Sequence, residues 1–217
     1  MKKIPSLFQR NYNGDRLVRP EMVPGTKWVL SGTGTPTRKF DGTCCLIRDG
    51  RLYKRYEVKK VGSRPLPLEF EPAGDIDHIT GKIQGWLPVG DGPEDRWHMQ
   101  AWRNQEVHLG ALMGDHTFEL CGPNVQGNPE REYLLSEWPG PAMHILIPHG
   151  RFLLGDAPMP QWFEGPEQVS GFYDEVREFL RISDIEGIVW WRDLNDPDCD
   201  KAKVKGKDFG FKRGGTA

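Results

Sequence analysis

The 217-residue sequence has no long hydrophobic run, few cysteines and almost no net charge. A membrane-spanning helix needs an apolar run of about 18 residues, so none is expected. Segment 1–14 also lacks the apolar stretch of a signal peptide. Lys and Arg number 29 against 31 Asp and Glu, a net charge of −2. This balance argues against a protein that coats nucleic acid in the manner of a histone, which should be strongly basic.

The four cysteines lack the spacing of a metal site or of a disulfide framework. The sequence has no C-x-x-C pair and no histidine at ligand spacing from a cysteine. The adjacent Cys44 and Cys45 should point to opposite faces of a strand, so a bridge between them would be strained. For these two residues, Cys121 and Cys199, we therefore expect buried free thiols in a reducing cytoplasm.

Glycine and proline are abundant, with 26 and 18 residues, which predicts many turns and few helices. Two strand-like runs, 43–48 and 51–58, surround an Asp49-Gly50 pair typical of a hairpin turn. Further strands are predicted over 116–121, 187–191 and 202–205. The expected class is a mostly β, α+β fold.

One segment, 166–181, has the apolar spacing of a helix, and Pro166 suits its first turn. The Pro/Gly-rich segments 62–74 and 85–95 are interpreted as long surface loops. No internal repeat or linker is present, so we expect one domain over residues 1–217.

The charges are unevenly distributed along the chain. Segment 48–64 has seven basic and two acidic residues, and segment 201–217 has six basic and one acidic residue. The two segments are either parts of one focused anion site or ordinary solvated strand faces.

Five short motifs carry the chemistry. They are Lys39-Phe-Asp-Gly42, Arg55, Phe118-Glu-Leu120, Glu186-Gly-Ile-Val189 and Lys203-Val-Lys205. Each is weak alone, but in this order they resemble motifs I, Ia, III, IV and V of the covalent nucleotidyltransferases. The longer runs 39–45, 54–59, 118–129, 147–150 and 205–210 resemble the small ATP-dependent 5′-3′ RNA ligase family, over a catalytic core of about residues 27–211. The resemblance implies an adenylation domain with antiparallel sheets flanking a nucleotide cleft.

Lys39 is the implied nucleophile of this family. A lysine of ordinary pKa, about 10.4, is almost entirely protonated near neutral pH. Neighbouring cations lower that pKa, and Arg55, Lys203 and Lys205 are the candidate neighbours. The resemblance implies that Lys39 attacks the α-phosphorus of ATP, keeps AMP and releases pyrophosphate.

The resemblance also assigns nucleotide-binding roles around Lys39. The backbone of Thr37 and Arg38 would meet the adenine edge. Asp41 would bind a metal-bound water or orient the lysine, and Gly42 would allow a close backbone approach or form a turn.

Further along the chain, Arg55 would contact the ribose or a phosphate, and Glu119 would accept from a ribose hydroxyl. Lys54 should point to the opposite face from Arg55, into solvent. Phe118 alternates with Glu119 and is expected in the core.

Glu186 is the implied ligand of a divalent cation, Mg²⁺ or Mn²⁺, with Asp41 as the other candidate. Lys203 and Lys205 are two residues apart on a strand and so share a face. That geometry lets them flank one α-phosphate and neutralise charge in the transition state.

Two features have no settled role. Trp86, Trp97 and Trp102 lie among basic residues in a stretch interpreted as loop-rich. They either stack unpaired RNA bases or, as we favour, pack in the core or anchor a lid. His149 matches the family pattern, but a structural role is equally compatible with the sequence.

The expected activity is ATP-dependent joining of an RNA 5′-phosphate to a 3′-hydroxyl, on single-stranded or nicked RNA such as broken tRNA. Only twelve residues follow Lys205, so no OB-fold is expected, and no obligate protein partner is evident. Alternatives are a DNA ligase, a capping-type guanylyltransferase, or a non-catalytic nucleic-acid-binding domain of the same fold.

Overall fold

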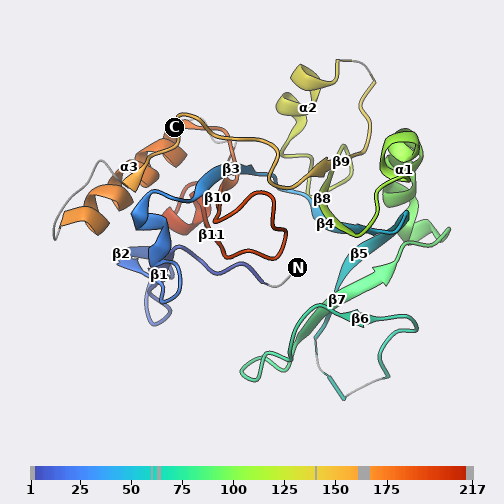
Figure 1. Ribbon diagram of the computed structural model, residues 1–217, viewed down its shortest axis with the longest axis horizontal. Helices are drawn as coiled ribbons and strands as arrows, with labels where there is room; N and C mark the ends of the chain where they lie inside the picture. Colours follow the sequence, from blue (N-terminus) through green and yellow to red (C-terminus); the bar gives the residue numbers. More distant parts are fainter. Residues whose placement is uncertain (1–2, 60, 63–64, 140, 161–166, 214–217) are drawn as a thin grey trace. The chain divides into compact units, whose positions relative to one another are not determined.

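The computed structural model describes residues 3–59, 61–62, 65–139, 141–160 and 167–213. Within them, antiparallel strands and three α-helices form an α+β fold, which confirms the predicted class (Figure 1). The strands are β1 (Phe8–Arg10), β2 (Val18–Met22), β3 (Thr35–Lys39), β4 (Thr43–Arg48), β5 (Arg51–Val58), β6 (Glu71–Pro72), β7 (Ile83–Pro88), β8 (Asp115–Cys121), β9 (Ile145–Pro148), β10 (Gly187–Trp191) and β11 (Lys201–Lys205). The α-helices are α1 (Arg96–Leu109), α2 (Arg131–Glu137) and α3 (Gln168–Ile182), and short 3-10 helices are η1 (Lys27–Ser31), η2 (Pro93–Asp95) and η5 (Gly206–Phe209). Among these described residues, no helix is long and apolar enough to cross a membrane.

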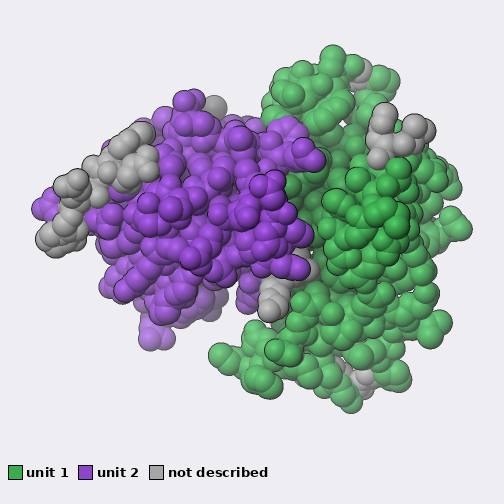
Figure 2. All heavy atoms as spheres, in the orientation of Figure 1, with its two compact units in different colours: residues 1–2, 41–149 green, residues 3–40, 150–217 purple. Residues whose placement is uncertain are grey.

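The chain divides into two compact units, which are coloured separately in Figure 2. Unit 1 contains Asp41–His149, and unit 2 contains Lys3–Phe40 together with Gly150–Ala217. Unit 1 is therefore an insertion between the two chain segments that build unit 2. The expectation of one nucleotidyltransferase domain over the whole chain stays a prediction.

Unit 1 is built on a six-stranded antiparallel sheet with the order β6-β7-β5-β4-β8-β9. The β4–β5 hairpin has the strand bounds that the sequence predicts. Its turn residues Asp49 and Gly50 have φ angles of 47° and 75°. A type I′ turn needs positive φ at both central positions, and Asp-Gly adopts them readily. Local turn chemistry thus sets the register at the centre of this sheet.

Two expected loops contain strands instead. Strand β6 lies within segment 62–74, and β7 extends into segment 85–95, where η2 follows it. Strand β7 pairs with β5 along its whole length, from Tyr53↔Pro88 to Val58↔Ile83. The glycine and proline residues weaken the alternation of this segment, but pairing with a neighbouring strand overrides the local preference. The expectation of loops was therefore wrong for these residues.

Helix α1 was not predicted, because it buries few aliphatic side chains. Its inner stripe, spaced by four residues, consists of Trp97, Ala101, Gln105 and Leu109, and Ala101 is completely buried. Gln105 faces the edge strand β9. Its amide nitrogen donates to the Leu146 carbonyl over 3.2 Å, and its amide oxygen accepts from the Leu146 N–H over 2.6 Å. A polar residue in the stripe thus satisfies the backbone of a sheet edge.

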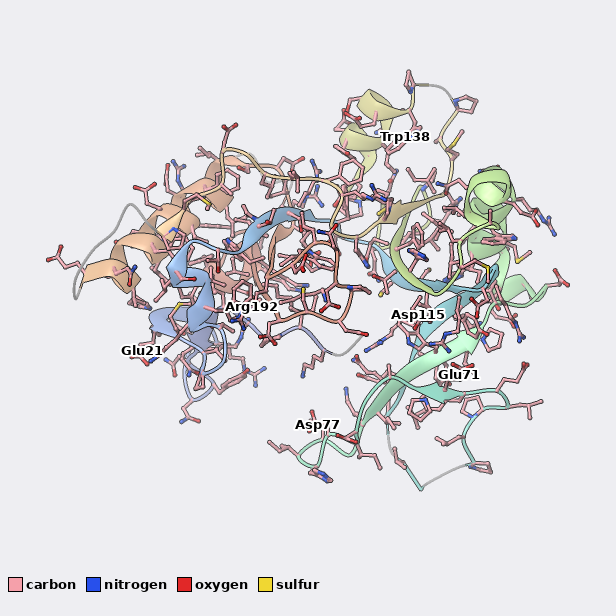
Figure 3. The ribbon with its side chains drawn as sticks, in the orientation of Figure 1. Glu21, Glu71, Asp77, Asp115, Trp138 and Arg192 are labelled. Atoms are coloured by element: carbon pink, nitrogen blue, oxygen red, sulfur yellow. The ribbon has the colours of Figure 1, made fainter. Side chains whose placement is uncertain are left out.

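Ion pairs on unit 1 connect strands across the sheet. The Arg48 guanidinium binds both carboxylate oxygens of Asp115 on β8, at 2.6 and 2.8 Å, and also binds Glu71 on β6. Asp115 and Glu71 are labelled in Figure 3. Hydrogen bonds from Arg48 hold the pKa of Asp115 below its usual value. These partners tie the central strand β4 to two other strands of the sheet.

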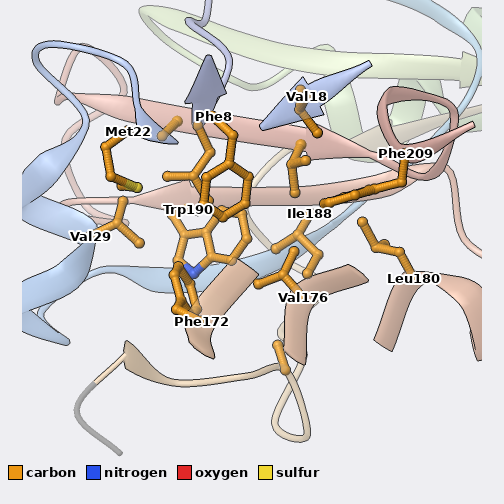
Figure 4. Packing of buried hydrophobic residues seen from close by; sticks show 14 residues of the cluster. Phe8, Val18, Met22, Val29, Phe172, Val176, Leu180, Ile188, Trp190 and Phe209 are labelled. Atoms are coloured by element: carbon orange, nitrogen blue, oxygen red, sulfur yellow. The ribbon is translucent and has the colours of Figure 1, made fainter. Parts of the chain in front are cut away.

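Unit 2 contains a three-stranded antiparallel sheet, β11-β10-β3, and the two-stranded sheet β1-β2. Helix α3 lies in the segment predicted as a helix and buries Phe172, Val176 and Leu180. The predicted start, Pro166, lies outside the described residues. Trp190, on the central strand, packs against Phe172 with the ring centroids 6.0 Å apart (Figure 4). The core therefore lies between one sheet face and α3, and the other face of β10 is left for polar chemistry.

Candidate active site

Three lysines and one glutamate gather on the sheet of unit 2. In the strand register, Gly187 of β10 lies between Lys39 of β3 and Lys205 of β11. Two residues along, Val189 lies between Thr37 and Lys203, so Lys203 shares the face of Lys205, as the K-x-K spacing predicts. Antiparallel pairing thus brings together residues 166 positions apart in the sequence, Lys39 and Lys205.

Glu186 is the counterion of this cluster and precedes β10. One carboxylate oxygen, Oε2, accepts from Lys39 Nζ, and the other, Oε1, accepts from Lys205 Nζ. The glutamate is only 8% exposed. Burial raises the pKa of Glu186, but the charges of Lys39 and Lys205 outweigh burial and hold that pKa below its usual value. The sequence-predicted Lys39, Glu186 and Lys205 therefore form one ion-pair network.

Lys203 supplies the third positive charge. Burial, together with the neighbouring charges of Lys205 and Lys39, lowers its pKa to about 8. An ammonium group held among like charges with one shared carboxylate attracts an anion. The cluster is chemically suited to a phosphate group.

Gly187 allows the strands beside it to come this close. A Cβ atom at this position would lie 2.1 Å from the carbonyl oxygen of Val204 and 2.9 Å from Lys205 Cα. Any side chain would therefore push β11 away from β10. The glycine of the Glu186-Gly-Ile-Val motif has a packing requirement that the sequence alone does not reveal.

Thr37 and Arg38 are held by backbone and side-chain contacts within unit 2. Thr37 is buried, and its hydroxyl donates to the Val189 carbonyl and accepts from Trp191 Nε1, at 3.0 and 3.1 Å. The Arg38 N–H donates to the Phe152 carbonyl over 2.8 Å. The predicted contact of this backbone with adenine stays a prediction, and any such contact must use groups other than the Arg38 N–H.

The remaining predicted site residues lie in unit 1. The Asp41 N–H donates to Glu130 Oε1 over 2.9 Å, and the Gly42 N–H donates to Glu119 Oε1 over 3.0 Å. A Cβ at Gly42 would lie 2.2 Å from the Leu120 carbonyl oxygen. The glycine of the K-x-D-G motif is thus required by the contact between β4 and β8, independently of any role in binding a nucleotide.

Glu119 is a buried carboxylate with a partner that the sequence did not identify. Its Oε2 atom lies 2.9 Å from His149 Nε2, and His149 Nδ1 lies 3.0 Å from the hydroxyl of Thr117. Phe118, which lies between Thr117 and Glu119 in the sequence, is buried in the core, as predicted. His149 and Glu119 are thirty residues apart, so no local pattern in the sequence indicates their contact. The only sequence signal for His149 was its match to the family pattern.

Arg55 lies over an aromatic ring on the same sheet. Its guanidinium carbon is 4.8 Å from the centre of the Trp86 ring, and its Nη2 donates to Gln84 Oε1 over 2.7 Å. Burial lowers the pKa of Arg55. Lys54, expected in solvent, instead pairs with the buried Asp95. That expectation was wrong because a carboxylate from η2 reaches this face of the sheet.

The three tryptophans do not lie in a loop-rich stretch. Trp86 is on β7 and buried, whereas Trp97 and Trp102 are on α1 and pack against the core of unit 1. Trp97 stacks on His144 with the ring centroids 4.6 Å apart. Their packing role is confirmed. Their assignment to a loop was wrong, because β7 depends on pairing with β5 and α1 has a polar residue in its inner stripe, so neither element has a clear pattern in the sequence.

The fold, an α+β arrangement of antiparallel sheets, is consistent with a nucleotidyltransferase-like domain. The chain is similar to proteins named RNA ligase 1 from Pongo abelii, Rattus norvegicus and Danio rerio, with identities of 26%, 25% and 28%. Each match covers 71% of this chain and 62% of the relative, so the chain spans less than two thirds of the length of the curated relatives it matches. No protein-family model matches it. These similarities confirm the resemblance to RNA ligases that the motifs indicate.

Proposed function

We propose that this protein is an ATP-dependent RNA ligase that works through a covalent lysyl-AMP. The observation that carries the proposal is the cluster of Lys39, Glu186, Lys203 and Lys205, in which residues of three separate motifs meet on one sheet face. The similarity to proteins named RNA ligase 1 supports the choice of RNA as substrate.

In the first step, a proton leaves the Lys39 ammonium and Nζ attacks the α-phosphorus of ATP. A phosphorus–nitrogen bond forms, and the bond from that phosphorus to the bridging oxygen breaks, so that pyrophosphate leaves. The charges of Lys203 and Lys205 favour loss of the Lys39 proton and offset the negative charge that builds on the α-phosphate. The Glu186 contact favours the protonated amine, so attack requires that Lys39 leave this ion pair.

In the second step, the RNA 5′-phosphate displaces Lys39 from the AMP phosphorus and forms a pyrophosphate linkage. In the third, an RNA 3′-hydroxyl attacks the 5′-phosphorus, joins the ends and releases AMP. Broken tRNA is one substrate that presents such ends.

A divalent cation, Mg²⁺ or Mn²⁺, fits the donor chemistry of Glu186. Magnesium is commonly held by one or two carboxylates together with the phosphates of a substrate. Glu186 is a buried carboxylate among phosphate-binding lysines, and Asp41 is the second candidate ligand. When bound, the cation would polarise phosphate oxygens and neutralise their charge. Each Glu186 oxygen accepts from one lysine, so the cation would take a remaining lone pair or replace one lysine contact.

The roles of the unit 1 residues remain proposals, together with that of the backbone at Thr37 and Arg38. Arg55 is proposed to bind a ribose or phosphate oxygen and Glu119 a ribose hydroxyl. Gly42 is proposed to permit close approach to the nucleotide.

The proposal is tested by incubating the protein with α-labelled ATP and magnesium or manganese, followed by a denaturing gel. We expect a labelled band that Lys39→Ala abolishes and that the matched control Lys27→Ala, at an exposed lysine of unit 2, retains. Lys205→Ala should label at least tenfold more slowly. Absence of a band with either metal would favour a non-catalytic nucleic-acid-binding domain.

Substrate competition separates the remaining alternatives. Stronger labelling by GTP than by ATP would indicate a guanylyltransferase, and preferential joining of deoxy-terminated ends would indicate a DNA ligase. The proposed RNA ligase should join ends that carry a 3′-terminal ribose.

A further inference from the structure

Unit 1 brings a thiol, an imidazole and a carboxylate together. The Sγ atom of Cys44, a carboxylate oxygen of Glu119 and a ring nitrogen of His149 all lie within 4.8 Å of one another. These three donor types, sulfur, nitrogen and oxygen, are the protein ligands of zinc. The spacing rule that excluded a zinc site in the sequence could not detect this group, because its members are far apart along the chain.

The sheet itself creates the proximity. Cys44 on β4 lies directly opposite Glu119 on β8 in the antiparallel register. Residues opposite each other on paired strands present their side chains to the same face of the sheet. His149 follows β9, the next strand, and its backbone N–H donates to the Thr117 carbonyl over 3.1 Å. Three adjacent strands therefore each supply, or lead to, one ligand.

Outer hydrogen bonds orient two of the three ligands. His149 Nδ1 is 3.0 Å from the Thr117 hydroxyl, and Glu119 Oε1 accepts from the Gly42 N–H over 3.0 Å. The atoms left facing each other, His149 Nε2 and Glu119 Oε2, are 2.9 Å apart. Zinc binds nitrogen and oxygen at about 2.0–2.2 Å, so two such ligands on a tetrahedral ion are about 3.3 Å apart. A small opening of this pair admits the ion.

The surroundings are those of an open site rather than a closed one. The side chains of Glu119 and His149 are 10% and 18% exposed, and Cys44 is half-buried. Three protein ligands and limited solvent access leave the fourth position of a tetrahedral ion to water or another molecule. The thiolate and imidazole also favour zinc over magnesium, which prefers oxygen.

We propose that Cys44, Glu119 and His149 form a binding site for Zn²⁺, with Thr117 and Gly42 as the hydrogen-bond partners that orient the ligands. Binding replaces the thiol proton of Cys44 and the contact between His149 and Glu119 with bonds to the metal. None of the three bonds depends on Lys39, so metal binding can be measured without ligation. Glu119 is also the residue proposed to bind a ribose hydroxyl, so zinc at this site would compete with that contact.

The test is titration of the intact, reduced protein with Co²⁺ alone, followed by displacement with Zn²⁺. Tetrahedral Co²⁺ should give intense visible absorption and, with Cys44 bound, a sulfur-to-cobalt band in the near ultraviolet. We expect Cys44→Ser to lose the near-ultraviolet band and His149→Ala to bind Co²⁺ at least tenfold more weakly. Thr117→Val, which removes only the outer hydrogen bond, should weaken binding by about tenfold or more.

The matched control is Cys199→Ser, which changes a cysteine of unit 2 and should leave the spectrum unchanged. Equilibrium dialysis should also give one zinc per chain. The proposal is overturned if dialysis gives no bound zinc, or if the sulfur-to-cobalt band survives Cys44→Ser. Circular dichroism of each variant checks that lost binding is not lost folding, and Thr117→Val still decides the matter if His149→Ala unfolds.

Discussion

The positive charge of Lys203 is disfavoured by burial and by two neighbouring lysines. Its side chain is partly buried beside Lys39 and Lys205, and burial together with these two charges lowers its pKa to about 8. A phosphate group placed among these lysines would relieve the repulsion. At the scale of single residues, the buried charge of Lys203 therefore lowers the stability of the folded protein, and a bound anion would restore that stability.

Replacing Lys203 by methionine should stabilise the protein at neutral pH. Below about pH 8 the lysine is protonated in the folded and the unfolded state, so the folded state bears the full cost of burying the charge. Between that value and its ordinary pKa of 10.5, the folded protein releases the proton first, and wild-type stability rises with pH. Lys203→Met should thus gain up to about 3 kcal/mol at pH 7, since one pKa unit is about 1.4 kcal/mol.

Urea unfolding at pH 7 and pH 10 measures this difference, and the gain should shrink as the pH rises. Lys207→Met, at an exposed lysine of η5, is the control and should change stability little at either pH. An equal gain for Lys203→Met at both values would contradict the assigned pKa.

At the scale of elements, a side chain of α1 satisfies backbone groups at the β9 edge of the unit 1 sheet. Gln105 of α1 donates to the carbonyl of Leu146 and accepts from its N–H. Helix α1 is otherwise short of aliphatic residues, so this polar contact helps to fix the helix against β9.

Gln105→Ala should destabilise the protein by about 1–3 kcal/mol, because it leaves the N–H and the carbonyl of Leu146 unsatisfied where water has little access. Thermal or urea unfolding measures the loss. The control is Arg103→Ala, on the exposed face of the same helix, for which little change is expected. Equal effects of the two substitutions would mean that helix propensity, and not the edge contact, is responsible.

The elements also show what the sequence could predict. The β4–β5 hairpin was predicted because its turn chemistry is a local signal, and β10 because it is a short run of β-branched and aromatic residues. Helix α1 was missed because Gln105 occupies an inner position of its stripe. The lysine cluster was predicted from motif order, whereas the Glu119–His149 contact and the opposition of Cys44 to Glu119 depend on strand register. Register across three strands is not visible in a single sequence.

At the scale of the whole molecule, unit 2 is assembled from both chain segments. Its core contains Leu7, Phe8 and Val18 from the first segment and Trp190, Val204 and Phe209 from the second. Phe8 and Phe209 pack with ring centroids 6.3 Å apart. The Leu7 N–H also donates to the Lys203 carbonyl over 2.7 Å, so the strand that carries Lys203 and Lys205 is bound to the N-terminal segment.

Phe209→Ala should therefore act on both segments. We expect a loss of about 3–5 kcal/mol in stability, as for other buried phenylalanines. Hydrogen exchange measured by mass spectrometry should show lost protection at β1 (Phe8–Arg10) as well as at β11. Faster exchange confined to residues next to Phe209 would contradict this coupling. The control is Leu153→Ala, at a 60% exposed position of unit 2.

The insertion of unit 1 has a consequence for protein synthesis. Lys39 leaves the ribosome before unit 1, but its partners Glu186, Lys203 and Lys205 are translated only after the whole of unit 1. Domains generally fold as units during translation, in order of their appearance. Unit 1 can therefore fold while Lys39 is still an ordinary, solvated lysine. Lys39 gains its electrostatic surroundings only after the whole of unit 1 has been made.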